Sequence, residues 1–275
     1  VLSGIITTAI GIGLTLLFTP RPKTPAPENG SIAVQQPTPY SIFGYGLARC
    51  AGAIMLKEES NGYLLYVAAL ARQAITGFAG LYLNDDLVNV PTVGTRLSGV
   101  VTAPTGVTDG RYGDSAISID TRLGAATETS YSLITAINNT VWGTNHRGDG
   151  IASLAMRCSP VKATVFSKTY PYQAPQPSPI IQFAKVYDPR DGAQSYTNPA
   201  TWVYSANAAL ALLHFECFSP FGSKRPYATA VLPVVSFWTQ AANDCDDAVA
   251  LKAGGTEPRY RLGGWTTTEQ ERRTT

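Results

Sequence analysis

Glycine and proline interrupt this chain at short intervals, with 25 glycines and 19 prolines among 275 residues. Proline fixes φ and lacks a backbone N–H, so it breaks helices and is excluded from central strands. Prolines gather in residues 20–30 (PRPKTPAPENG) and 171–179, which predicts two rigid, extended connections. The pattern as a whole predicts an α+β fold that is mainly β, with short strands, many turns and short helices.

The N-terminal segment is strongly apolar. Residues 1–19 carry no charged side chain and match the ~20 residues that span a bilayer. We expect an apolar helix there, followed by a Pro-rich linker over residues 20–39. Hydropathy alone favours a membrane anchor. The alternative is a helix packed against neighbouring subunits, because Gly4, Gly11 and Gly13 would allow backbones to approach closely.

The rest of the chain is predicted to form two parts. Residues 40–190 form a β-rich domain, because apolar runs of strand length alternate there with turn residues. Residues 91–115 are rich in Gly, Thr, Pro and Asp and predict a surface excursion from this domain. Residues 163–166 are predicted to form a strand. Residues 191–275 form a second region, helical first and then β.

Two helices are expected in the second region. Residues 207–218 (NAALALLHFECF) contain no Gly or Pro and are rich in Ala and Leu, which indicates a helix. Ser205 or Asn207 is expected to cap it. Residues 237–250 predict the second helix. His214, on the apolar first helix, is interpreted as a buried or interface histidine.

Charge and cysteine content exclude some functions. Charged residues make up only 15% and the net charge is +2, without a basic stripe, which excludes direct sequence-specific binding of nucleic acid. So little charge indicates a surface partly covered by neighbouring subunits. The four cysteines form no CxxC pair and no His is spaced to complete a zinc site, so we expect reduced thiols, no metal and no cofactor.

The densest group of carboxylates is Asp244, Asp246 and Asp247. On a helix Asp244 and Asp247 share a face at i, i+3, so a hydrolase with a carboxylate pair is one hypothesis. No EF-hand or HxxE spacing accompanies them, which favours a solvated or interface helix face. Asp188 is expected to cap a turn and Arg190 to pair with a carboxylate. No nucleophile elbow, P-loop or GxGxxG motif is present, so the chain is not expected to be an enzyme.

Six segments, taken in order, resemble a known family. They are QQPTPYSIFGYGLARCAGAI, LYLNDDLV, HRGDGIASL, KVYDPRDG, TWVYSANAALALLHF and NDCDDAVALKAGGTEPRYRLGG. Together they are similar to the N-terminal region of the phage tail tip attachment protein J family, which forms the central tail hub of long non-contractile tails. The last segment is the most specific of the six.

The resemblance implies a structural role for these motifs. Its structural and interface candidates are Asp188, Arg190, Trp202, Ser205, Asn207, Cys245, Asp246, Gly254, Gly255, Glu257 and Arg259. The two glycines are expected to supply turn conformations that other residues avoid. Glu257 and Arg259 are expected to form a buried or interfacial ion pair.

The resemblance also implies hub-type β-domains, partners and a location. It implies a homotrimer on the tail axis that contacts the distal tail protein, other tail tip subunits and the tape measure protein. The trimer would seal the lumen and then open it, so that DNA passes in transit during host entry. The location is the tail tip of the virion, after assembly in the host cytoplasm. Family members continue into further domains, so the second region is expected to extend beyond residue 275.

In this setting residues 1–19 are interpreted as an intersubunit or lumen-plug helix, with transient contact to the host membrane left open. The alternative function is a membrane-anchored bacterial protein with a β-rich body. That alternative depends on the apolar segment alone.

Overall fold

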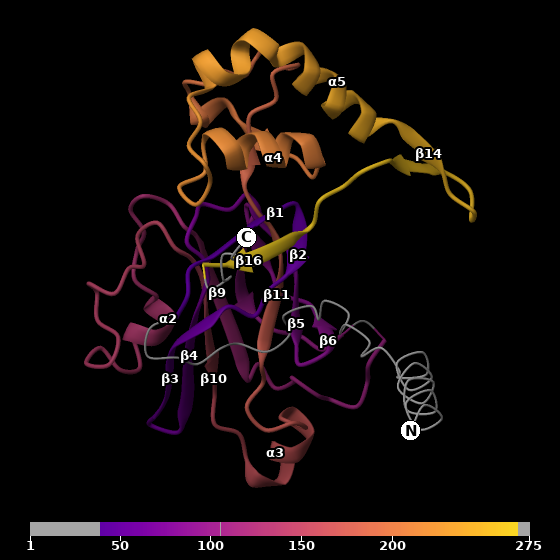
Figure 1. The fold of residues 1–275 in the computed structure, drawn as a ribbon. Coiled ribbons are helices and arrows are strands. Elements are labelled where there is room, and N and C mark those ends of the chain that lie inside the picture. Colours follow the sequence, from indigo (N-terminus) through magenta and orange to yellow (C-terminus); the bar gives the residue numbers. More distant parts are fainter. Residues whose placement is uncertain (1–38, 105, 269–275) are drawn as a thin grey trace, which may run out of the picture.

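The computed structural model describes residues 39–104 and 106–268, and its fold is α+β and mainly β, as the sequence predicts. Two antiparallel sheets form the body (Figure 1). The larger has the strand order β3 (Ala53–Ser60), β4 (Tyr63–Ala71), β10 (Ala152–Cys158), β9 (Ile117–Leu123), β8 (Arg96–Val100), β7 (Thr92–Val93). The smaller has the order β2 (Leu47–Arg49), β11 (Pro177–Gln182), β5 (Gly77–Leu83), β6 (Asp86–Val88). The expected apolar helix and nearly all of the expected linker lie outside the described residues.

Strand β4 is almost wholly apolar because both of its faces are buried. Tyr66, Ala68 and Leu70 face the main core, which the smaller sheet completes with β5 and β11 side chains. Leu65 and Val67 face the other side, where the short helix α2 (Ser132–Thr135) and its neighbours cover them. The β3–β4 turn contains Asn61 and Gly62 at φ 53° and 82°, the left-handed pair that tight hairpins require.

Two expectations about this body are wrong. Residues 163–166 belong to a helix, α3 (Ala163–Thr169), because β10 already pairs with β4 and β9 and leaves no edge for another strand. Residues 91–115 are not wholly a surface excursion, since β7 and β8 lie there and β8 pairs with β9. Leu97, Val101 and Tyr112 of this segment are buried in the main core.

The second region begins with short elements. They are β12 (Lys185–Val186), the 3₁₀ turn η1 (Pro199–Thr201) and β13 (Val203–Tyr204), which pairs with β12. Helix α4 (Ala208–Cys217) follows and confirms the helix expected over 207–218. A π-turn η2 (Tyr227–Val231) and a 3₁₀ turn η3 (Leu232–Val234) then lead into α5 (Val235–Asp246).

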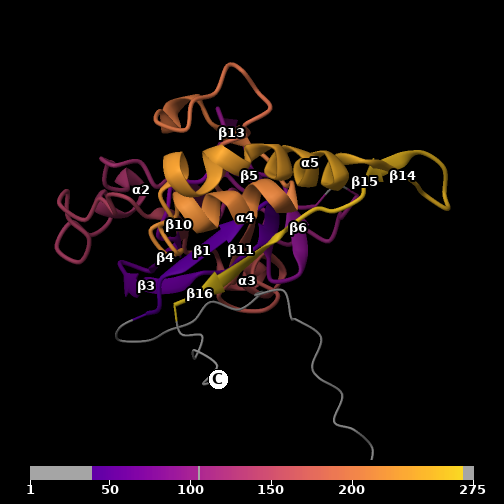
Figure 2. The same cartoon turned by 45° about the horizontal axis from the view of Figure 1, so that its top comes forward.

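Helix α5 ends at Asp246, four residues before the predicted end. Asp247 leaves the helical conformation, and β14 (Ala248–Ala250) pairs with β15 (Thr256–Pro258) as a hairpin. Figure 1 shows α4 and α5 together at one end of the molecule, and both Figures 1 and 2 show the hairpin projecting beyond α5. No helix among the described residues is long and apolar enough to cross a membrane.

The last strand returns to the first. β16 (Gly264–Thr267) pairs antiparallel with β1 (Ile42–Tyr45) in a two-stranded sheet of their own. Trp265 Nε1 donates a hydrogen bond to the Arg49 carbonyl at 2.9 Å, which ties β16 to β2 as well. The second region is therefore attached to the first domain at both of its ends.

A glycine at the β1–β2 corner allows this closure, and its replacement tests it. Gly46 has φ 62°, and a Cβ there would collide with the Leu262 carbonyl. Gly94 has φ 61° but open space around a Cβ. We expect Gly94→Ala to lower the free energy of unfolding by about 1 kcal/mol, the cost of the left-handed conformation alone. Gly46→Ala is expected to cost at least twice as much in the same urea titration, and equal losses would contradict the close contact.

Candidate functional site

Asn207 holds the two long helices together. Its Oδ1 accepts hydrogen bonds from the backbone N–H groups of Ala209 and Leu210, at 3.0 and 3.2 Å, and so caps α4. Its Nδ2 donates to the Ala242 carbonyl of α5 at 2.8 Å. The sequence predicted either Ser205 or Asn207 as the N-cap of this helix, and the structure shows that it is Asn207. Ser205 Oγ instead accepts from the Asn207 N–H at 3.1 Å and holds the capping residue in place.

Arg190 joins the turn after β12 to the end of α5. Its guanidinium donates to both carboxylate oxygens of Asp188, from Nε to Oδ1 at 2.9 Å and from Nη2 to Oδ2 at 2.7 Å. It also donates to Asp246 at 2.9 Å and to the Asn243 side chain at 3.0 Å. The hydrogen bonds from Asp188 raise the pKa of the guanidinium further above its usual value. The prediction that Arg190 pairs with a carboxylate is confirmed, and Asp188 also accepts from the Arg190 N–H as a turn cap.

An aromatic cluster that includes Trp202, His214 and Phe218 packs at the C-terminal part of α4. Trp202 is buried, and its indole N–H donates to the Ser195 carbonyl at 2.8 Å. The ring packs against Phe218 and, edge to face, against His214. His214 Nδ1 and the Tyr45 hydroxyl are hydrogen bonded at 2.8 Å, which links α4 to β1. Partial burial lowers the pKa of His214 to about 4, so the ring is neutral at neutral pH.

The projecting hairpin confirms one prediction and corrects another. Gly254 and Gly255 lie in its turn at φ 89° and 85°, conformations that other residues avoid. The expected Glu257–Arg259 pair is not formed within the chain. Arg259 Nη2 lies 3.4 Å from Asp247, and both of these side chains are half exposed. The reason is register: Ala248 faces Pro258 across the hairpin, so Arg259 stands opposite Asp247.

The segment after the hairpin runs along the end of α5 back to the body. The Tyr260 N–H donates to the Cys245 carbonyl at 3.0 Å, and the Leu262 N–H donates to the Ala206 carbonyl at 2.8 Å. The Cys245 side chain is buried between the helices. These contacts bring Asp188, Arg190, Asn207, Cys245 and Asp246 into one unit, although they are distant in the sequence.

A pocket of about 500 Å³ opens beside this unit. Its lining comes from separate stretches of the chain: Leu47, the segment Tyr204–Asn207, Asp246, Pro258, and the segment from Arg261 to Gly263. Sequence reasoning missed this pocket and its basic residue, Arg261. No local motif marks Arg261, because the pocket exists only after β16 has returned to β1.

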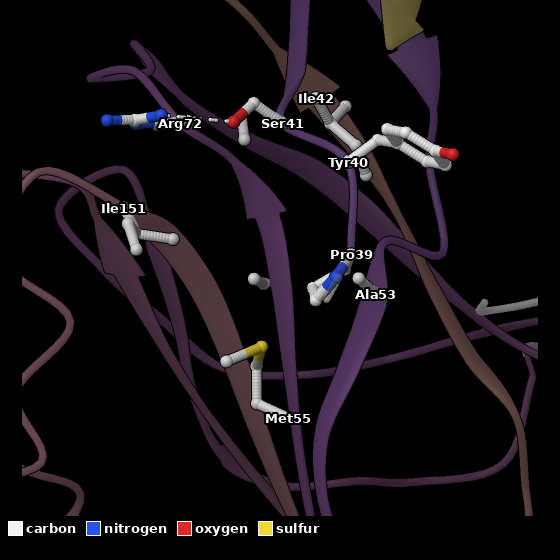
Figure 3. A pocket seen from close by; sticks show the side chains of 10 residues that line it. Pro39, Tyr40, Ser41, Ile42, Ala53, Met55, Arg72 and Ile151 are labelled. Carbon is white, nitrogen blue, oxygen red and sulfur yellow. Dashed lines mark hydrogen bonds between the residues drawn. The ribbon is translucent and has the colours of Figure 1, made fainter. Parts of the chain in front are cut away.

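A smaller pocket of about 120 Å³ lies between the start of β1 and strands β3 and β4 (Figure 3). Met55, Ala53 and Ile151 give it a mainly apolar lining. Arg72 at its rim donates to Ser41 Oγ at 3.3 Å. No acid and base face each other across this pocket, so it offers no arrangement for proton transfer.

The geometry does not support a hydrolase site formed by Asp244 and Asp247. Asp244 accepts from Gln240 Nε2 at 2.8 Å, whereas Asp247 faces Arg259, so the two carboxylates have separate partners. Within residues 39–104 and 106–268, no three His, Cys, Asp or Glu side chains lie close enough together to hold a metal ion. Burial raises the pKa of the Cys50 and Cys158 thiols to about 12, which leaves them unreactive.

Removing the Arg190 guanidinium tests whether it fixes α5 to the body. Arg190→Ala leaves Asp188 and Asp246 without their shared cation, and we expect a loss of about 1–3 kcal/mol in the free energy of unfolding. Arg225→Ala is the matched control, because Arg225 forms an exposed pair with Glu216 and should cost well under about 1 kcal/mol. Urea unfolding measures both, and equal effects would show that Arg190 is only a surface residue.

The partly buried His214 predicts a pH dependence of stability. In the unfolded chain His214 gains a proton below its ordinary pKa of 6.5, whereas in the folded protein it stays neutral down to about 4. Stability is therefore complete above pH 6.5 and falls as the pH drops to 4, by up to about 3 kcal/mol. We expect His214→Gln, which keeps an acceptor for Tyr45, to unfold with a flatter pH profile than wild type. Parallel profiles for the two proteins would contradict this assignment.

Comparison with known proteins finds likeness among the solved structures. No protein family matches the chain, and no curated protein does. A chain from the virion of a native gene transfer agent (GTA) particle aligns with a TM-score of 0.36 and 13% sequence identity. The alignment covers 98% of this chain, which spans 57% of the length of the matched chain. A TM-score of this size does not establish a common fold.

Proposed function

We propose that the chain is a structural component of a phage-type virion, and more specifically the scaffold end of the central tail hub at the tail tip. There it would join the tail tube to the tip and gate the lumen for DNA ejection. The observation that carries the proposal is the ordered set of six segments, from Gln35 to Gly264, that resemble the hub family. Agreement in order across most of the chain is more specific than any one short motif.

The arrangement of these segments supports an architectural role. The three C-terminal segments meet at one place, through Arg190 with Asp246 and through Ala206 with Leu262. Each of these residues is used to hold backbone or side chains in position. Arg190 and Asp246 are paired with each other and Asn207 bonds backbone groups, although Asn207 and Asp246 also line the pocket of about 500 Å³. The proposed role is therefore not enzymatic.

The surface supports assembly into a larger particle. Phe237 on α5 is 75% exposed and Leu212 on α4 is 52% exposed, at the end of the molecule where the two helices lie. Contact with another subunit would remove this apolar surface from water. The proposed partners are further copies in a homotrimer, the distal tail protein, other tail tip subunits and the tape measure protein, with DNA only in transit.

Fractionation of a producing culture tests this function. We expect the chain to co-purify with intact particles through density-gradient centrifugation and a high-salt wash, with the major capsid protein as the internal reference. Disrupted particles should retain it in the tail fraction. A strain that lacks the gene should release particles that do not infect. Recovery only with host membranes, and none with particles, would contradict the proposal and support the membrane-anchored alternative.

A further inference from the structure

No other part of the described chain packs over the hairpin of residues 248–258, here called the arm. β14 and β15 form a separate two-stranded sheet, and nearly every residue of the arm is exposed. Figures 1 and 2 show it projecting beyond α5 in both views. An isolated two-stranded hairpin is marginally stable in water, because it buries little apolar surface. An arm of this kind gains stability when another surface covers it.

The pocket of about 500 Å³ beside the root of the arm, here called the root pocket, has a matching composition. Leu47 and Leu262 line it and are 47% and 41% exposed. Leu251 of the arm is exposed to the same degree, at 41%. Both surfaces thus present apolar side chains of similar size to solvent.

The arm and the root pocket each carry charges of both signs, Glu257 and Lys252 on the arm and Arg261 and Asp246 at the pocket. Arg261 is the basic residue of the pocket lining, and it has no acidic partner among the described residues, since Asp246 is engaged by Arg190. Glu257 is the acidic residue of the arm, and it has no basic partner in the same part of the chain, since Arg259 is engaged by Asp247. One unpaired carboxylate on the arm therefore matches one unpaired guanidinium in the pocket.

We propose that the arm of one copy of this chain enters the root pocket of a second copy, where Glu257 pairs with Arg261 of that copy and Leu251 covers Leu47 and Leu262. Of the arm's residues, only Pro258 at its root lines the pocket of its own chain, and the rest of the arm projects beyond α5. The contact joins two different surfaces, so it is heterologous and closes into a ring at a suitable angle. The inference rests on the proposed function only in taking that ring to be the hub trimer.

Charge exchange tests the pairing. In sedimentation velocity of the full-length chain, we expect wild type to self-associate with rising concentration. Glu257→Arg and Arg261→Glu should each weaken association about tenfold or more, because each places like charges together. The double variant Glu257→Arg/Arg261→Glu should regain most of the wild-type association. Thermal unfolding of every variant checks that the fold is retained, which is expected because both side chains are exposed.

Lys57→Glu is the control, because Lys57 is exposed on β3, outside the arm and the root pocket. It should associate like wild type. Association that is absent in wild type, unaffected by the single reversals or not restored in the double variant would overturn the inference. These outcomes are separate from the proposed function, since recovery of the chain in purified particles is measured without reference to the arm. If the chain is found in virions but its self-association is unchanged by the charge reversals at Glu257 and Arg261, the proposed function is retained and the arm contact is refuted.

Discussion

The antiparallel pairing of β1 with β16 fixes the position of the helices of the second region on the β-rich body. It brings residues 42–45 and 264–267 together, so the chain returns to its first strand after the helices and the arm. Tyr45, at the end of β1, then meets His214 of α4, and the chain from Arg259 to Leu262 is drawn along the end of α5. Without this closure neither the helical unit nor the root pocket would have a fixed position on the body.

Two side chains, Asn207 and Arg190, hold the helical unit together. Asn207 serves two helices with one amide, and Arg190 serves two carboxylates with one guanidinium. Hydrogen bonds with charged partners are stronger than neutral ones, so Arg190 holds the end of α5 against the turn after β12. The arm begins directly after this end of the helix.

Much of the fold could be predicted from local patterns, and the errors share one physical cause. The helix over 207–218, the left-handed glycines of the arm and the role of Arg190 follow from composition and turn chemistry over a few residues. Tertiary pairing decided the rest. Both edges of β10 are already paired, so residues 163–166 do not form a strand beside it. Strand β8 pairs with β9. The register of the hairpin places Arg259 beside Asp247 and not beside Glu257. The root pocket combines residues from positions 47 to 263, which no local pattern can bring together.

The central claim is that this chain is an architectural subunit of a tail hub. Electron cryo-microscopy of the intact particle, with symmetry determined separately for the tail tip, tests it most directly. The account predicts density for residues 39–268 at the end of the tail tube, arranged with three-fold symmetry about the axis, with each arm seated on a neighbouring copy. Tail-tip density that this fold does not fit, or a particle without the chain, would contradict it.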